Sequence, residues 1–163
     1  MTTIRISIAL SLLGLLAACG GPGEDAEIPE AQPAGATSAD IGDYVVHFSA
    51  QSTDQLPPEI ARAYNIVRSK NRAMLNVSIL RASDGIAVPG DVTVQTFNLT
   101  AQLKNVTLRR IDEPGVQDAP GAIYYVGVTP VANRETLKFY ISVTPEGVEK
   151  ASEVLFIRQF YTD

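Results

Sequence analysis

The densest group of cationic side chains in the sequence is a run of three in five residues at the start of a predicted strand. Arg68, Lys70 and Arg72 alternate with uncharged residues, so in an extended chain all three would project to the same side. Together they would form a small site for a phosphate or carboxylate group. Two structural alternatives remain open: a solvated strand edge that resists edge-to-edge pairing, or pairing with acids such as the C-terminal Asp163. The sequence therefore predicts an anion or partner site here without deciding its role.

Cys19 is the only cysteine, and it follows a stretch with the pattern of a bacterial signal peptide. Arg5 precedes the apolar run 6–16, which is shorter than the roughly 20 residues that span a bilayer core and has the length of a signal-peptide hydrophobic region. The residues Leu16-Ala17-Ala18-Cys19 resemble a lipobox, in which diacylglycerol is attached to the cysteine thiol. Residues 1–18 are thus predicted to be a lipoprotein signal peptide, and acyl chains on Cys19 to hold the mature protein on a membrane.

Residues 19–40 are predicted to form a lipidated, flexible tether. Gly, Pro, Ala and acidic residues dominate them, and Ile28 is the only large apolar side chain. Such a segment cannot bury enough surface to offset the entropy of ordering it, and a coil of this length spans about 25 Å. Gly20 stands where an aspartate would signal retention at the inner membrane. The outer membrane, on its periplasmic side, is therefore the favoured location.

His47 is the only histidine and lies between apolar neighbours on a predicted strand. A metal site needs several ligands, and no acids stand at ligand spacing around His47. A serine hydrolase would carry a Gly-x-Ser-x-Gly stretch, which the sequence lacks, and the only thiol is assigned to lipid attachment. The sequence therefore predicts a non-catalytic protein that uses neither a metal nor a cofactor.

The charge of the remaining domain, residues 41–163, is nearly balanced. The whole chain carries a net charge of -5 at pH 7. Five of its acids lie in the tether: Glu24, Asp25, Glu27, Glu30 and Asp40. A balanced domain has no overall field that would attract nucleic acid. The expected partners are the membrane, through the acyl chains, and another envelope protein or ligand; nucleic acid is not expected.

Apolar residues in the domain recur mostly at every second position and are interrupted by Gly and Pro, as in β-strands. The alternation is cleanest over residues 137–143, whereas the stretch 103–111 changes phase in the middle, which predicts one strand with a bulge. Tyr124 and Tyr125 must point to opposite faces of their strand, so at most one of them lines a surface groove. Seven strands are predicted: 42–49, 72–80, 91–99, 103–111, 122–129, 137–143 and 153–161.

One short helix is predicted over residues 57–64, after the first strand. Proline and glutamate suit its first turn, and Ile60 and Tyr64 share a face. Turn-forming residues separate the strands at regular intervals. About seven short strands in a domain of this size favour an all-β fold, a single immunoglobulin-like antiparallel β-sandwich.

Four blocks of the domain carry a resemblance to a known family: GDYVVHF at 42–48, PEIARAYNIVRSKNR at 58–72, ETLKF at 135–139 and QFYTD at 159–163. They resemble a family of proteobacterial envelope proteins known as a domain of unknown function, DUF4426. The blocks are spread over essentially all of residues 41–163, and the stretch 68–72 is the most specific of them. The resemblance implies an immunoglobulin-type sandwich and brings no known activity.

These observations predict a membrane-anchored periplasmic lipoprotein that acts as a non-catalytic binding or interaction module. The alternative is an accessory or enzymatic domain that acts on an anionic envelope substrate through Arg68, Lys70 and Arg72. A third hypothesis is a purely structural envelope lipoprotein, in which these cations contribute only to stability.

Overall fold

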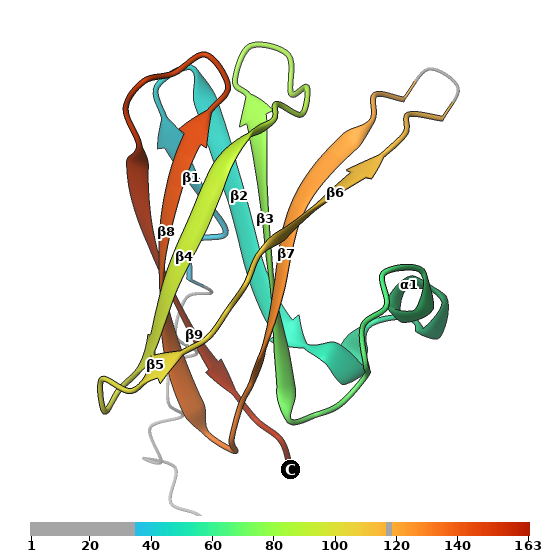
Figure 1. The fold of residues 1–163 in the computed structure, drawn as a ribbon, viewed down its shortest axis with the longest axis vertical. Coiled ribbons are helices and arrows are strands. Elements are labelled where there is room, and N and C mark those ends of the chain that lie inside the picture. The colour runs from blue at the N-terminus through green and yellow to red at the C-terminus, as the bar shows by residue number, and fades with distance from the viewer. Residues whose placement is uncertain (1–34, 117–118) are drawn as a thin grey trace, which may run out of the picture. The chain divides into compact units, whose positions relative to one another are not determined.

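The computed structural model describes residues 35–116 and 119–163, which form a β-sandwich of two antiparallel sheets (Figure 1). Its strands are β1 (Ser38–Ile41), β2 (Tyr44–Ser52), β3 (Arg72–Arg81), β4 (Gly90–Asn98), β5 (Leu103–Lys104), β6 (Arg109–Glu113), β7 (Ala122–Pro130), β8 (Glu135–Pro145) and β9 (Ser152–Phe160). The five-stranded sheet has the order β1-β2-β3-β7-β6, and the four-stranded sheet has the order β5-β4-β8-β9. The prediction of an all-β sandwich is therefore confirmed.

The strand order is that of an immunoglobulin-like sandwich. The strands β2-β3-β7-β6 correspond to the A-B-E-D sheet of that fold, and β4-β8-β9 correspond to its C-F-G sheet. Two short strands, β1 and β5, are added at the outer edges of the two sheets. The alternation of apolar residues thus predicted six of the strands, and the spacing of turn residues supported the class of the fold.

The prediction of a single strand over residues 103–111 is wrong. β5 pairs with β4 in one sheet, whereas β6 pairs with β7 in the other. The change of phase that we interpreted as a bulge marks the segment between β5 and β6, where the chain crosses from one sheet to the other (Figure 1). Gly127 on β7 allows this segment to pass close by, because a Cβ at that position would lie only 2.6 Å from Val106 Cγ1.

The five-stranded sheet begins earlier than the composition predicted. β1 lies mostly within residues 19–40, which we assigned to the tether, and it pairs with β2 in an antiparallel hairpin. The residues of β1 are mostly small or polar, so they show no alternation of apolar side chains. The strand is recognised only from its pairing with β2. Gly42 closes the hairpin with a positive φ of 72°, which glycine adopts without strain. Cys19 and the predicted signal peptide lie outside the described residues.

The predicted helix is present as α1 (Pro58–Ala63), with a 3-10 turn η1 (Thr53–Gln55) before it. Proline occupies its first turn, as expected. Leu56 and Ala61 are buried, and α1 covers part of the outer face of the five-stranded sheet (Figure 1). Within the described part of the chain, no helix is both long enough and apolar enough to cross a membrane.

The core lies between the two sheets and is built from the inward positions of the alternating strands. The ring of Phe156 on β9 lies between two others, with centroid distances of 5.1 Å to Phe48 and 5.7 Å to Phe139. The most deeply buried large apolar side chains come from β2, β3 and β8: Val46, Leu75, Val77, Ile79, Leu137, Phe139, Ile141 and Val143. This burial fixes which residues of each strand face outward.

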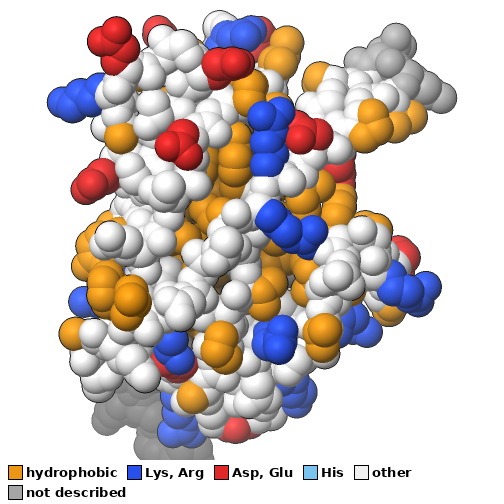
Figure 2. All heavy atoms as spheres, in the orientation of Figure 1, with side chains coloured by type: hydrophobic (Ala, Val, Ile, Leu, Met, Phe, Trp, Pro, Cys, Tyr) orange, Lys and Arg blue, Asp and Glu red, His pale blue; other side chains and the backbone are white. Residues whose placement is uncertain are grey.

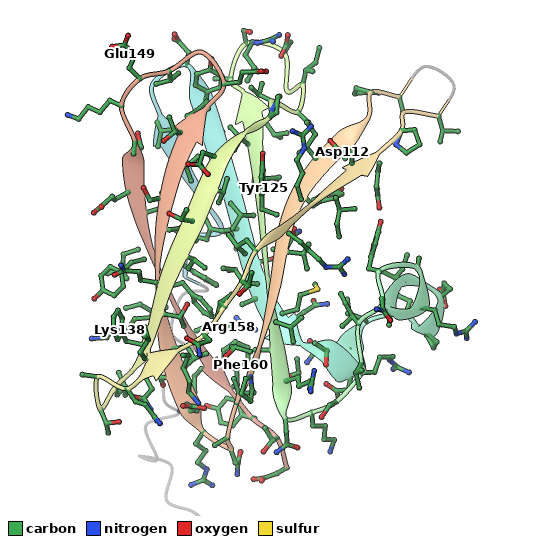
Figure 3. All side chains as sticks on the ribbon, viewed as in Figure 1. Asp112, Tyr125, Lys138, Glu149, Arg158 and Phe160 are labelled. Atoms are coloured by element: carbon green, nitrogen blue, oxygen red, sulfur yellow. The ribbon has the colours of Figure 1, made fainter. Side chains whose placement is uncertain are left out.

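A tyrosine hydroxyl connects the two sheets. Tyr125 on β7, labelled in Figure 3, is buried, and its hydroxyl donates a hydrogen bond to the carbonyl oxygen of Gly90 at 2.7 Å. The same hydroxyl accepts a hydrogen bond from the backbone N–H of Gly90 at 2.8 Å. A Cβ at position 90 would lie 2.5 Å from the carbonyl oxygen of Thr144. Glycine is therefore required where β4 begins, and Tyr125 satisfies both of its backbone groups.

A largely buried ion pair joins β5 to the start of β8. The carboxylate of Glu135 lies 2.8 Å from Lys104 Nζ, and it accepts hydrogen bonds from the backbone N–H of Ala132 at 2.8 Å and from Asn98 Nδ2 at 3.3 Å. Burial raises the pKa of the Glu135 carboxyl, but the hydrogen bonds from Lys104, Ala132 and Asn98 outweigh it and hold this pKa below its ordinary value.

We expect Glu135→Gln to lower the free energy of unfolding at pH 7 by about 1 kcal/mol. Because the pKa of Glu135 is lower in the folded than in the unfolded protein, its contribution is fully present above the unfolded-state pKa and is lost as the pH falls through the folded-state pKa. In urea denaturation, the native protein and the variant should therefore differ at pH 7 and converge as the pH falls through the folded-state pKa of Glu135. Glu149→Gln, in the exposed turn labelled in Figure 3, is the control. A difference that does not change with pH would contradict the ionic role of Glu135.

Candidate functional site

The outer face of the five-stranded sheet carries the candidate site. The register of the strands places Ser49 of β2, Asn76 of β3, Val126 of β7 and Arg109 of β6 in one row across the sheet. Neighbouring strands lie about 4.8 Å apart, so the row extends about 10 Å from Asn76 to Arg109. Three adjacent hollows lie along this face.

The central hollow has a volume of about 240 Å³ and lies between α1 and the strands β3, β7 and β6. Figure 2 shows a notch between the projecting β6–β7 hairpin and the helix, with hydrophobic side chains at its inner end. Asn76 and Glu113 are its polar lining residues. The other side chains that line it are apolar or aromatic: Leu56, Ile60, Tyr64, Met74, Ile111, Tyr124 and Val126.

Asn76 contributes an unpaired acceptor to this surface. Its Oδ1 atom is buried and has no hydrogen-bond partner among the described residues. An unpaired buried acceptor costs about 1–3 kcal/mol, so a donor from outside the chain would stabilise this oxygen. Asn76 also lines a polar hollow of about 190 Å³ together with His47, Ser49 and Ser78. It therefore stands at the junction of the central and polar hollows.

A third hollow, which we call the cationic hollow, has a volume of about 270 Å³ and is lined by both Arg72 and Arg109. Val126 lines this hollow as well as the central one. Arg109 Nη2 donates a hydrogen bond to the carbonyl oxygen of Tyr64, just after α1. Arg109 therefore lies at the boundary between the central and cationic hollows.

The structure does not bring Arg68, Lys70 and Arg72 together on one strand face. β3 begins at Arg72, so the other two cations lie in the preceding loop, where the two-residue period does not apply. Thr53 holds this loop, because its buried hydroxyl donates to the carbonyl oxygen of Val67 at 2.9 Å and accepts from the N–H of Ser69 at 2.9 Å.

The three cations have different surroundings. Arg68 donates a hydrogen bond to the carbonyl oxygen of Asp54 at 2.5 Å. Lys70 donates to a backbone oxygen of Asp163 at 3.0 Å, which is the contact expected under the structural alternative. Arg72 lines the cationic hollow together with Arg109 of β6, which no sequence pattern had marked.

The remaining candidates from the sequence also have defined places. Tyr125 is buried and Tyr124 lines the central hollow, so the two neighbours face opposite sides of the sheet as predicted. His47 is exposed at the polar hollow. In residues 35–116 and 119–163, no three His, Cys, Asp or Glu side chains are grouped so that they could hold a metal ion.

A family model and a solved structure of the same family both match the chain. The model of the family described as "Domain of unknown function (DUF4426)" matches residues 38–163. The crystal structure of a DUF4426 family protein from Pseudomonas aeruginosa PAO1 has 31% sequence identity and a TM-score of 0.65, and the match covers 77% of this chain and 94% of that one.

Two further comparisons add nothing to the argument about function. A family 123 glycoside hydrolase from Clostridium perfringens is 12% identical, with a TM-score of 0.28 and coverage of 71% of this chain and 27% of that one, and this likeness is too low to bear on either fold or activity. None of the curated proteins compared with the chain matches it.

Proposed function

Because the chain belongs to the DUF4426 family, as its sequence blocks predicted, and because that family name specifies no activity, we propose its function from the geometry of the site. The protein is a lipid-anchored, non-catalytic binding module of the periplasm that holds a partner on the outer face of its five-stranded sheet. The observation that carries this proposal is the buried, unpaired Oδ1 of Asn76 at the junction of two hollows.

The proposed anchor is the acylated thiol of Cys19, placed by the lipobox-like residues before it. The residue after the cysteine, which is not an aspartate, supports attachment to the outer membrane. The segment between Cys19 and β1 separates the proposed anchor from the domain. The domain can therefore present its binding face to a partner away from the lipid headgroups.

The lining of the central hollow favours binding over catalysis. Most of its side chains are apolar, and Glu113 is the one carboxylate among its described lining residues. General acid–base work usually needs two titratable groups that converge on one substrate. A small concave surface with a single unpaired acceptor is instead typical of a site that orients a bound group.

The alternative function, an accessory or enzymatic domain acting on an anionic envelope substrate, relied on Arg68, Lys70 and Arg72 acting together. Two of these cations already contact backbone oxygens of the chain, at Asp54 and Asp163. Arg72 lines the cationic hollow and remains available to bind an anion there. We therefore propose the binding module in preference to this alternative.

Site-specific photocrosslinking in intact cells tests the proposal. We expect a photoreactive phenylalanine at position 124 of the full chain to form an adduct of defined mass. We expect Asn76→Leu to reduce this adduct about fivefold, since it removes one hydrogen-bond acceptor. The control places the same probe at Tyr140, which is 45% exposed on the outer face of the other sheet. Adducts formed only at position 140, or unchanged by Asn76→Leu, would refute the proposed site.

A further inference from the structure

We infer that the outer face of the five-stranded sheet binds a peptide segment that carries a large apolar side chain and a carboxylate. The side chain fills the central hollow, a backbone N–H of the peptide donates to Asn76 Oδ1, and the carboxylate meets Arg72 and Arg109. This inference rests on the proposed function and names the chemistry of the partner that the site would take.

The size of the central hollow points to a single side chain. Its volume of about 240 Å³ exceeds that of a cavity of about 150 Å³ that holds benzene. It remains below the roughly 300–1,000 Å³ of pockets that enclose drug-sized ligands. A phenylalanine, leucine or methionine side chain fits this range, whereas a whole acyl chain of a membrane lipid would leave much of its length exposed.

The cationic hollow suits an anion. Arg72 and Arg109 both line it, and in the described residues neither arginine forms an ion pair. None of the described residues that line this hollow is a carboxylate. A guanidinium has five N–H donors, and in the described part of the chain the Arg109 side chain has one partner, the carbonyl oxygen of Tyr64. Donors of both arginines thus remain for a carboxylate, the anion that guanidinium groups bind in a bidentate manner.

The spacing of these groups suits an extended peptide. Asn76 and Arg109 are separated by two strand spacings, about 10 Å. Val126, which lines both the central and the cationic hollow, lies between them in the row. An extended chain advances about 3.3–3.6 Å per residue, so about three residues cover this distance. A peptide therefore offers an N–H for Asn76, a side chain over Val126 and a carboxylate for Arg109 in the right order. Either a free C-terminus or an Asp or Glu side chain can supply the carboxylate.

Fluorescence anisotropy with three probes tests this inference on the full chain in detergent. The probes are fluorescein-labelled Gly-Gly-Phe-Ala-Ala as the free acid, the same peptide as its C-terminal amide, and the amide with Asp as its last residue. We expect the free acid to bind at least about tenfold more tightly than the plain amide, as expected for one lost charge-assisted contact. If the Asp-containing amide binds as tightly as the free acid, any carboxylate at this spacing suffices; if it binds like the plain amide, the site is specific for a C-terminus.

Arginine variants assign the effect to the cationic hollow. Arg72→Gln and Arg109→Gln should each remove most of the preference for the acid, with circular dichroism showing that both variants are folded. Arg110→Gln is the matched control, because Arg110 lies on the same strand but faces the other way and pairs with Asp112 at 2.6 Å. The control should retain the full preference for the acid.

Different results would refute the carboxylate site for a peptide and the proposed binding face. Equal binding of the acid and the plain amide, or a preference that survives in both Arg72→Gln and Arg109→Gln, would overturn the carboxylate site. If no peptide binds but phosphatidylglycerol vesicles or inorganic phosphate bind through these two arginines, the peptide is the wrong class of ligand. In each of these cases the crosslinked adduct at position 124 still decides whether this face is the binding surface.

Discussion

Replacement of Cys19 by serine is expected to move the protein from the membrane fraction of cells to the soluble fraction. A serine hydroxyl does not form the thioether that carries the diacylglycerol, so the chain would lose all of its acyl groups. Two or more acyl chains hold a protein stably on a bilayer, whereas a chain without any has no such attachment. The expected change is therefore nearly complete relocation, measured by fractionation of the envelope and immunoblotting.

Mass spectrometry of the native protein provides the direct companion measurement. The N-terminal peptide of the mature chain should begin at Cys19 and carry the mass of the acyl groups. Gly21→Ser, two residues further along the chain, is the matched control and should leave the protein in the membrane fraction. A protein that remains membrane-bound as Cys19→Ser, or a native N-terminal peptide without lipid, would show that the anchor has been misassigned.

Replacement of Tyr125 by phenylalanine is expected to lower the free energy of unfolding by about 2–4 kcal/mol, because the N–H and the carbonyl oxygen of Gly90 both lose a partner and each unpaired group costs about 1–3 kcal/mol. The phenylalanine ring fits the same space, so the effect isolates the hydroxyl. Since domains of this size are stable by about 5–15 kcal/mol, the change is a large fraction of the total. Equilibrium denaturation in urea measures it.

Tyr124→Phe is the matched control for this experiment. Tyr124 precedes Tyr125 in the chain, but its side chain faces outward and lines the central hollow. Its hydroxyl can remain in contact with water, so we expect a change of less than about 0.5 kcal/mol. Equal destabilisation by the two substitutions would show that the link between Tyr125 and Gly90 does not hold the sheets together as the hydrogen bonds suggest.

The fold was largely predictable from the sequence because alternation along a strand is a local property. Residues 137–143 alternate between apolar and polar side chains, and the observed strand β8 contains all of them with the apolar set buried. The crossing between β5 and β6 was missed for a physical reason. A chain that changes sheets also changes which side is buried, and this produces the same local change of phase as a bulge.

The candidate site was less predictable because it depends on pairing between distant strands. Asn76 and Arg109 lie on strands whose order in the sheet does not follow their order in the chain. The sequence showed three cations near one another at Arg68, Lys70 and Arg72, but the loop before β3 directs two of them to other contacts. The local signals for the site were Arg72, which lines the cationic hollow, and the pair Tyr124 and Tyr125, through the opposite directions of neighbouring side chains.

The position of β1 determines how mechanical tension would enter the domain. A pull on the N-terminus loads β1 first, and because β1 forms a hairpin with β2, its four residue pairs separate in turn, starting with Ser38 opposite His47. β2 is held to β3 over its whole length, so the remainder of the sandwich stays closed. Thr37 and His47 both line the polar hollow. Peeling of β1 would therefore alter one end of the binding face, and tension in the tether would act on the shape of the site.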